Sequence, residues 1–149
     1  MDLHTKIDQM LTETRVVLPG VQAMMGFQLI VVMTDAFERL PAAFQNLHLA
    51  GLALTTLSTV LLLTPAAIHR IAFSGEDDAQ FHMIGTWLVS AALVPLAAGV
   101  AAEIFIGTWR LFETLSVSIG SAVMALTILI AAWYVLPFWL HTHKTKEAP

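Results

Sequence analysis

Four long apolar stretches dominate this sequence and determine the solvent that surrounds it. Each stretch holds roughly the 20 apolar residues that an α-helix needs to cross about 30 Å of hydrocarbon. Only 12% of the residues are charged, against about 25% in an average soluble domain. The expected spans cover residues of about 21–40, 47–73, 81–106 and 115–140. We therefore predict an all-α fold, an integral membrane four-helix bundle surrounded by a lipid bilayer.

The segments outside these spans are short. Residues 3–18 have apolar side chains at helical spacing and predict a short amphipathic helix, which lies along the membrane interface or packs under the bundle. Pro19 and Gly20 follow, and we expect them to break the helix. The predicted organisation is a cytoplasmic or interfacial helix over residues 1–20, a membrane domain over 21–140 and a cytoplasmic tail over 141–149.

The distribution of Lys and Arg predicts the orientation. With an even number of spans, both termini lie on the same side of the membrane. That side collects Lys6, Arg15, Arg70, Lys144 and Lys146, and the other side has Arg39 and Arg110. Because cytoplasmic loops carry the excess of Lys and Arg, we predict a multi-pass protein of the cell inner membrane with both termini in the cytoplasm.

Several function classes leave no trace in the sequence. The chain has no Cys and therefore no disulfide or thiolate-bound metal. Its seven Lys and Arg residues form no basic stripe for nucleic acid. The acidic residues at 76–78 are interpreted as helix caps, the alternative being a divalent-cation site. Since no nucleophile elbow, phosphate loop or zinc spacing occurs, we predict no enzymatic activity and no metal.

Two carboxylates are expected inside the membrane near its outer face. Asp35 lies about 7–8 Å inside the end of the first span, and Glu103 about 6 Å inside the end of the third, which runs in the same direction. His48 and Arg110 can reach that region. A carboxylate partly removed from water has a raised pKa, so these four residues are candidates for a proton- or cation-binding cluster. The alternative is structural pairing of Glu103 with Arg110 or His48.

Other polar residues in the spans are interpreted as structural. Glu38 and Arg39 belong to a helix that runs out into the headgroups, with Asp35 and Arg39 at the spacing of a helical ion pair. Gln28 lies in mid-span and needs a hydrogen-bond partner at a helix or subunit contact, or less often in a pore lining.

Small residues recur at four-residue spacing, which lets membrane helices approach closely. The packing candidates are Gly51, Gly99 and Gly120, in the patterns Gly51-x3-Thr55, Ala91-x3-Pro95-x3-Gly99 and Ser116-x3-Gly120.

His69 and His82 raise the possibility of haem. They end the second span and begin the third on the same side of the membrane. Two histidines from separate helices can ligate a six-coordinate haem, whereas ordinary hydrogen bonds to nearby residues are the alternative. We predict no cofactor and keep haem as the alternative.

The stretches ETRVVLPGVQAMMGFQLIVVMTDAFERLP, LTPAAIHRIA and GEDDAQFH resemble a small family of bacterial four-span membrane proteins of unknown function. Some members carry the label sodium:proton antiporter. The resemblance covers most of residues 13–100 and implies the fold, the bacterial inner membrane and the topology given above. It supplies no catalytic motif. Glu13, Arg15, Asp35, Glu38, Arg39, His69 and Arg70 fall within the quoted stretches.

Three functional hypotheses follow. The first is a protein that acts by helix association, as a homo-oligomer or as an accessory subunit of a larger membrane complex. The second is a transport component driven by protons or sodium through the outer acidic cluster, which requires at least a dimer because four helices enclose little volume. The third is a haem-bearing electron-transfer subunit.

Overall fold

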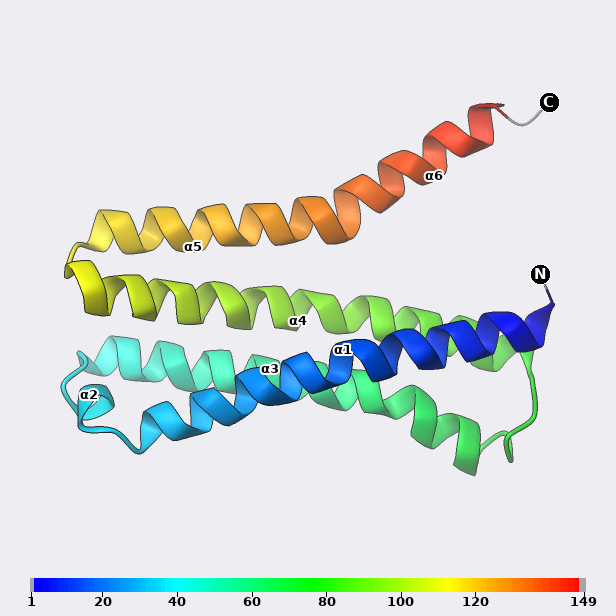
Figure 1. Cartoon of the computed structure of the whole chain (residues 1–149), viewed down its shortest axis with the longest axis horizontal. Coiled ribbons are helices and arrows are strands. Elements are labelled where there is room, and N and C mark those ends of the chain that lie inside the picture. The colour runs from blue at the N-terminus through cyan, green and yellow to red at the C-terminus, as the bar shows by residue number, and fades with distance from the viewer. Residues whose placement is uncertain (1, 148–149) are drawn as a thin grey trace. The chain divides into compact units, whose positions relative to one another are not determined.

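The computed structural model describes residues 2–147, and within these the ordered elements are helical (Figure 1). The elements are α1 (Leu3–Val32), α2 (Asp35–Glu38), α3 (Ala42–Ile71), α4 (Ala79–Phe112), α5 (Leu115–Ile130), the π-helix η1 (Ala131–Val135) and α6 (Leu136–Glu147). Among the described residues, four helices are long and apolar enough to cross a membrane: α1, α3, α4 and the continuous helix Leu115–His143. The predicted all-α membrane fold is therefore confirmed.

The chain divides into two compact units. The first unit comprises Met1–Gly99 and the second Val100–Pro149, so the division falls inside α4. The first unit holds α1, α2, α3 and α4 up to Gly99. The second holds the remainder of α4, then α5, η1 and α6. Each unit is described by itself below.

Helix α1 begins at a side-chain cap and continues through a proline. The Asp2 carboxylate accepts a hydrogen bond from the backbone N–H of Thr5 at 2.8 Å. Pro19 lies inside the helix, where it removes only the hydrogen bond to the carbonyl of Arg15. The expected break at Pro19 and Gly20 is therefore not observed, and the predicted amphipathic helix and first span form one helix.

The charges along α1 show which part of it fits a bilayer. Arg15 is its last charged residue, and residues 16–32 contain no Asp, Glu, Lys or Arg. At about 1.5 Å per residue they extend about 26 Å, close to the hydrocarbon thickness of about 30 Å. Residues 16–32 thus fit a bilayer by length and composition, and we call them the membrane-spanning part of α1.

A compact turn follows α1. The helix ends at Val32, and Thr34 caps the four-residue helix α2 by accepting a hydrogen bond from the Phe37 N–H at 3.3 Å. The Gln45 side chain, from the first turn of α3, closes the turn by donating to backbone carbonyls. Their residues are Phe37, Glu38 and Leu40, at 3.2, 3.3 and 3.1 Å.

Helices α1 and α3 lie side by side in the first unit (Figure 1). The buried face of α3 follows helical spacing and contains mostly small or polar residues. Its members are His48, Gly51, Thr55, Ser58, Thr59, Leu62 and Pro65. An apolar cluster of Ile7, Met10 and Phe81 fills the end of the unit near the N-terminus.

The loop between α3 and α4 uses the predicted acidic cap. The Asp78 carboxylate accepts hydrogen bonds from the backbone N–H groups of Gln80 at 2.7 Å and Phe81 at 3.1 Å. Ser74 and Gly75 precede it with φ values of 51° and 82°. The interpretation of this loop as a helix cap is confirmed at Asp78.

In the second unit, α4 and α5 are joined by a tight turn. Glu113 adopts a left-handed φ of 48° and donates its N–H to the carbonyl of Trp109 at 2.8 Å. The hydroxyls of Thr108 and Ser121 lie 3.0 Å apart and connect the end of α4 to α5. The turn therefore needs only Glu113 and Thr114 between the two helices.

The last helix changes its winding before a proline. The π-helical turn Ala131–Val135 separates α5 from α6, and Pro137 follows it in the first turn of α6. Because proline lacks an N–H and its ring crowds the carbonyl four residues earlier, a local π-turn lets the helix continue. Residues 141–147 of the predicted tail continue α6, and residues 148–149 lie outside the described residues.

Candidate functional site

The structure places Asp35 outside the membrane-spanning part of α1. Because α1 ends at Val32, Asp35 is the first residue of α2, and its side chain is exposed. Glu38 and Arg39 are exposed as well and lie on α2 and at its C-terminal cap. The ion pairs between described side chains do not include Asp35 with Arg39. This differs from the expectation of a carboxylate 7–8 Å inside the first span, because the helix stops earlier than the apolar pattern suggested.

His48 is a buried link between three helices. It is fully buried, and its Nε2 lies 3.0 Å from the backbone carbonyl oxygen of Gln28 in α1, so Nε2 donates. The Phe37 ring of α2 lies edge-on to the imidazole, with the ring centroids 5.3 Å apart. Gln28 is itself only 3% exposed. His48 thus ties α3 to α1 and α2.

The other two members of the predicted outer cluster belong to the second unit. Glu103 is half-buried and Arg110 is exposed near the end of α4. Asp35 and His48 belong to the first unit. A cluster of all four residues stays a prediction.

Two glycines, Gly51 of α3 and Gly99 of α4, lie where these helices approach each other closely. A Cβ atom added at Gly99 would lie 2.8 Å from Thr55 Oγ1 and 3.2 Å from the carbonyl oxygen of Gly51. Contacts that short leave no room for a side chain. Gly99 is therefore required where the two helices meet.

A buried hydroxyl adds a second connection between these helices. Ser58 Oγ donates to the carbonyl oxygen of Ala92 at 2.9 Å. Pro95 lies one turn further along α4 and deprives this part of the helix of an N–H donor. Ser58 thus supplies a donor from α3 beside the proline-interrupted stretch of α4.

Gly120 has different surroundings. It is exposed on α5, and nothing lies within 4 Å of a Cβ atom added there. Ser116, one turn earlier, is exposed too. Within the described residues of the second unit, the small-residue face of α5 is therefore not packed against another helix.

His69 and His82 line different cavities. His69 packs on the Phe81 ring with centroids 4.7 Å apart, and it lines a cavity together with Arg15 and Arg70. His82 lines another cavity, together with Lys6. The described residues also contain no group of three or more His, Asp or Glu side chains that could hold a metal ion. The geometry thus supplies no observation that favours haem over ordinary packing.

Sequence reasoning missed the cavity beside His69. It has a volume of about 400 Å³ and lies between α1 and α3. Arg15 and Arg70 line it, and neither forms an ion pair among the described residues. The distribution of Lys and Arg could have indicated this cavity, because it predicts that Arg15 and Arg70 lie on the same side of the membrane.

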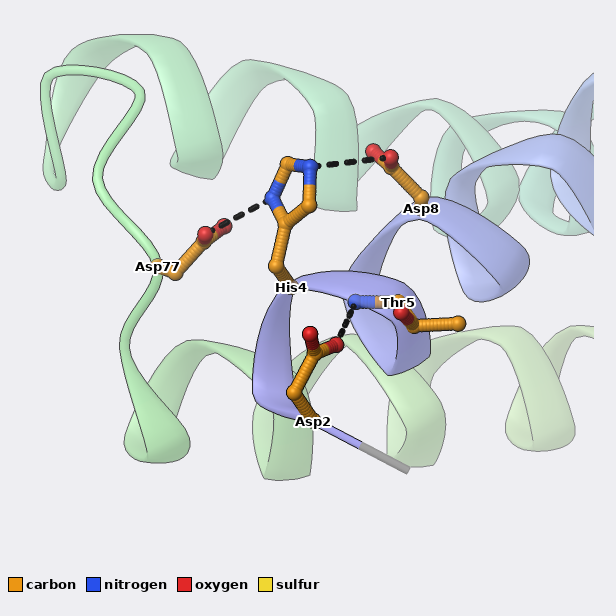
Figure 2. A network of polar contacts seen from close by, with 5 residues as sticks. All are labelled: Asp2, His4, Thr5, Asp8 and Asp77. Atoms are coloured by element: carbon orange, nitrogen blue, oxygen red, sulfur yellow. Dashed lines mark hydrogen bonds and ion pairs between the residues drawn. The ribbon is translucent and has the colours of Figure 1, made fainter.

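Sequence reasoning also missed a polar network at the start of α1, drawn in Figure 2. The His4 ring lies between two carboxylates, with Nδ1 2.8 Å from Asp77 and Nε2 3.4 Å from Asp8. Imidazole can donate from both nitrogens only when it is protonated. His4 precedes the membrane-spanning part of α1. The hydrogen bond to Asp77, together with the charges of Asp77 and Asp8, raises the pKa of His4 above its ordinary value.

This network fastens the start of α1 to the loop between α3 and α4, which carries Asp77. At the same end, hydrogen bonds from Thr5 hold the pKa of Asp2 below its ordinary value. The groups are solvent-exposed, so we assign the network a small effect on stability.

Comparison with known families decides the classification. The sequence model of a family of unknown function (DUF6328) matches residues 3–137. The chain belongs to this family. The match covers the whole of α1 to η1 and reaches the start of α6, beyond the stretches that carried the resemblance. No curated protein and no solved structure matches the chain.

Proposed function

We propose that this member of the family is a bacterial inner-membrane protein, with both termini in the cytoplasm, that acts by association of its helices. The proposed assembly is a homo-oligomer in which α5 of one copy packs against α5 of another; an accessory role in a larger membrane complex would use the same face. Five Lys and Arg residues on the side of the termini, against two on the other side, support the orientation.

The exposed small-residue face of α5 carries this proposal. Within the most apolar window of each helix, 6% of the residues are buried in the last span, against 11% in α1, 33% in α3 and 39% in α4. Ser118 is the buried residue of α5. In lipid, helices associate mainly by close packing and hydrogen bonds rather than by burial of apolar surface. Gly120 and Ser116 provide the close approach that such packing requires.

The structure gives less support to proton- or sodium-coupled transport. That hypothesis uses Asp35 within the first membrane-spanning helix, whereas Asp35 lies on the four-residue helix α2, after α1 has ended. His48 is fully buried and already hydrogen-bonded to a backbone carbonyl. Helix association is therefore the better supported function.

A pair of glycine variants tests the proposed interface. Gly120→Leu fills the open face of α5, and we expect it to raise the dissociation constant of the oligomer by about tenfold or more, since close helix contact is lost. Gly26→Leu is the matched control, because nothing lies within 4 Å of a Cβ atom added at Gly26 either. The measurement is the mass of the protein in detergent over a range of protein-to-detergent ratios. Equal masses for wild type and Gly120→Leu at every ratio would reject α5 as the interface.

A further inference from the structure

We infer that the cavity between α1 and α3, lined by Arg15, His69 and Arg70 and called the groove below, binds the headgroup of an anionic phospholipid. The lipid phosphate lies against the two arginines, and the start of an acyl chain lies along the apolar wall of the groove. This site belongs to the first unit and goes beyond the proposed association through α5.

The shape of the groove suits a small amphipathic ligand. Its volume of about 400 Å³ falls in the range of about 300–1,000 Å³ that is typical of ligand sites. One part of the lining is basic, with Arg15, His69 and Arg70, and another part is apolar, with Leu18, Leu62 and Leu63. A lipid presents the same two surfaces.

The charge of the groove is unbalanced. None of the residues that line it is Asp or Glu, whereas the two neighbouring cavities of the same unit are both lined by Glu13. Arg15 and Arg70 are exposed and form no ion pair among the described residues. The guanidinium group presents a planar set of donors that matches a phosphate group. Two such groups at one cavity therefore favour an anion with phosphate oxygens.

His69 provides an independent observation. Its Nε2 is buried and has no hydrogen-bond partner within the described part of the chain. A buried nitrogen without a partner is costly, and the Phe81 ring packed against the imidazole holds it in place. A phosphate or glycerol oxygen in the groove could supply the missing partner.

The position of the groove distinguishes a lipid from free phosphate. Arg15 is the last charged residue before the uncharged residues 16–32 of α1, and Arg70 is the penultimate residue of α3. Leu18 follows Arg15, and Leu62 precedes Arg70, on the hydrocarbon side of each arginine. The basic part of the groove thus lies at headgroup depth and its apolar part reaches into the hydrocarbon. Basic pockets between membrane helices at this depth are typical sites for anionic lipids.

The test is lipid binding to the purified full chain in a neutral detergent, followed by native mass spectrometry. The probes are dioleoylphosphatidylglycerol, dioleoylphosphatidylcholine and inorganic phosphate. We expect phosphatidylglycerol to be retained by the wild-type protein, phosphatidylcholine to be retained far less, and inorganic phosphate not to displace phosphatidylglycerol at equal concentration. For Arg15→Gln/Arg70→Gln we expect binding of phosphatidylglycerol to weaken by about 25-fold, about five-fold for each arginine.

Arg39→Gln/Arg110→Gln is the matched control, since it removes two other exposed arginines and changes the net charge equally. Its binding should equal that of wild type. Circular dichroism shows whether each variant remains helical. A second test uses the unmodified protein, whose affinity for phosphatidylglycerol should fall as salt is raised.

Three results would overturn the inference: equal binding of the two lipids, an equal loss in the control variant, or complete displacement by inorganic phosphate. The last of these would identify a soluble phosphate site instead. Because the readout is lipid retained per chain, failure here is distinct from failure of the oligomer.

Discussion

The two units of this protein use small residues in opposite ways. In the first unit, Gly51 and Gly99 lie where α3 and α4 touch, and a Cβ atom at Gly99 would collide with Thr55. In the second unit, Gly120 has nothing within 4 Å of an added Cβ atom. The same sequence pattern therefore marks an internal contact in one unit and an unoccupied face in the other.

The polar side chains show the same contrast. Thr55 and Ser58 of α3 are fully buried, and Ser58 bonds a carbonyl of α4. On α5, the hydroxyl of Thr127 bonds a carbonyl of its own helix and is exposed. Since lipid offers no hydrogen bonds, a membrane helix satisfies its hydroxyls at carbonyls of its own helix, as Thr55 and Thr127 do, or at those of an adjacent helix, as Ser58 does. The buried face of α3 thus contacts α4 through Ser58, whereas α5 contacts α4 through Ser121 and leaves Thr127 exposed.

The largest expected effect is at the close approach in the first unit. We expect Gly99→Val to lower the free energy of unfolding by about 2–3 kcal/mol, because its side chain must displace Thr55 and the backbone of Gly51. The measurement is thermal unfolding in detergent. Gly107→Val is the control in the same helix, since nothing lies within 4 Å of a Cβ atom added there. An equal loss in both variants would show that helix propensity, not the contact, sets the cost.

A smaller effect is expected from the buried hydroxyl. Ser58→Ala removes the hydrogen bond that α3 donates to the Ala92 carbonyl, and we expect the free energy of unfolding to fall by about 1 kcal/mol. In the second unit, Ser121→Ala should cost less than half of that, because Ser121 is half-exposed. Unfolding of both variants measures the difference. A larger loss for Ser121→Ala would reverse the comparison between the units.

A stabilising change is expected in the turn of the second unit. Glu113 has a φ of 48°, where a residue with a side chain is strained by about 1 kcal/mol relative to glycine. Glu113→Gly should therefore raise the unfolding temperature. Thr114→Gly is the control at a φ of −121° and should lower it. No gain from Glu113→Gly would mean that the extra freedom of the unfolded chain offsets the relieved strain.

The smallest effect is a pH dependence confined to the first unit. Because the folded chain raises the pKa of His4, its contribution is complete below the ordinary pKa of 6.5 and is lost as the pH rises through the folded value. Hydrogen exchange in residues 3–8 should therefore become faster, beyond the intrinsic pH effect, as the pH rises through this window. The charged groups nearby are Asp2, Lys6, Asp8, Glu76, Asp77 and Asp78.

Asp77→Asn is the control for this pH dependence, because it removes the strongest partner of His4. In this variant, hydrogen exchange in residues 3–8 should accelerate with pH by little more than the intrinsic pH effect. An unchanged pH profile in Asp77→Asn would assign the effect to another group at this end of the unit.

The sequence predicts the helices better than it predicts the site. Length and hydropathy suffice for four membrane helices, because hydrocarbon demands long apolar runs. They do not locate the end of α1, since Met33 and Ala36 are apolar although the helix stops at Val32. Asp35 was therefore expected within a span that does not reach it.

The remaining features depend on pairing between distant segments. The contact of His4 with Asp77 joins residues 73 positions apart, and the groove of Arg15 with Arg70 joins two antiparallel helices. No local pattern encodes such pairs. Pro19 shows that a local pattern can also mislead. Proline usually breaks a soluble helix, but it is tolerated inside α1.

Disulfide cross-linking in native membranes tests association through α5 most directly. The chain has no native Cys, so Ser116→Cys introduces a single thiol on the open face of α5. Under mild oxidation we expect a covalent dimer from Ser116→Cys and almost none from Thr56→Cys, an exposed position on α3. Strong cross-linking at position 56 with none at position 116 would contradict an assembly built through α5.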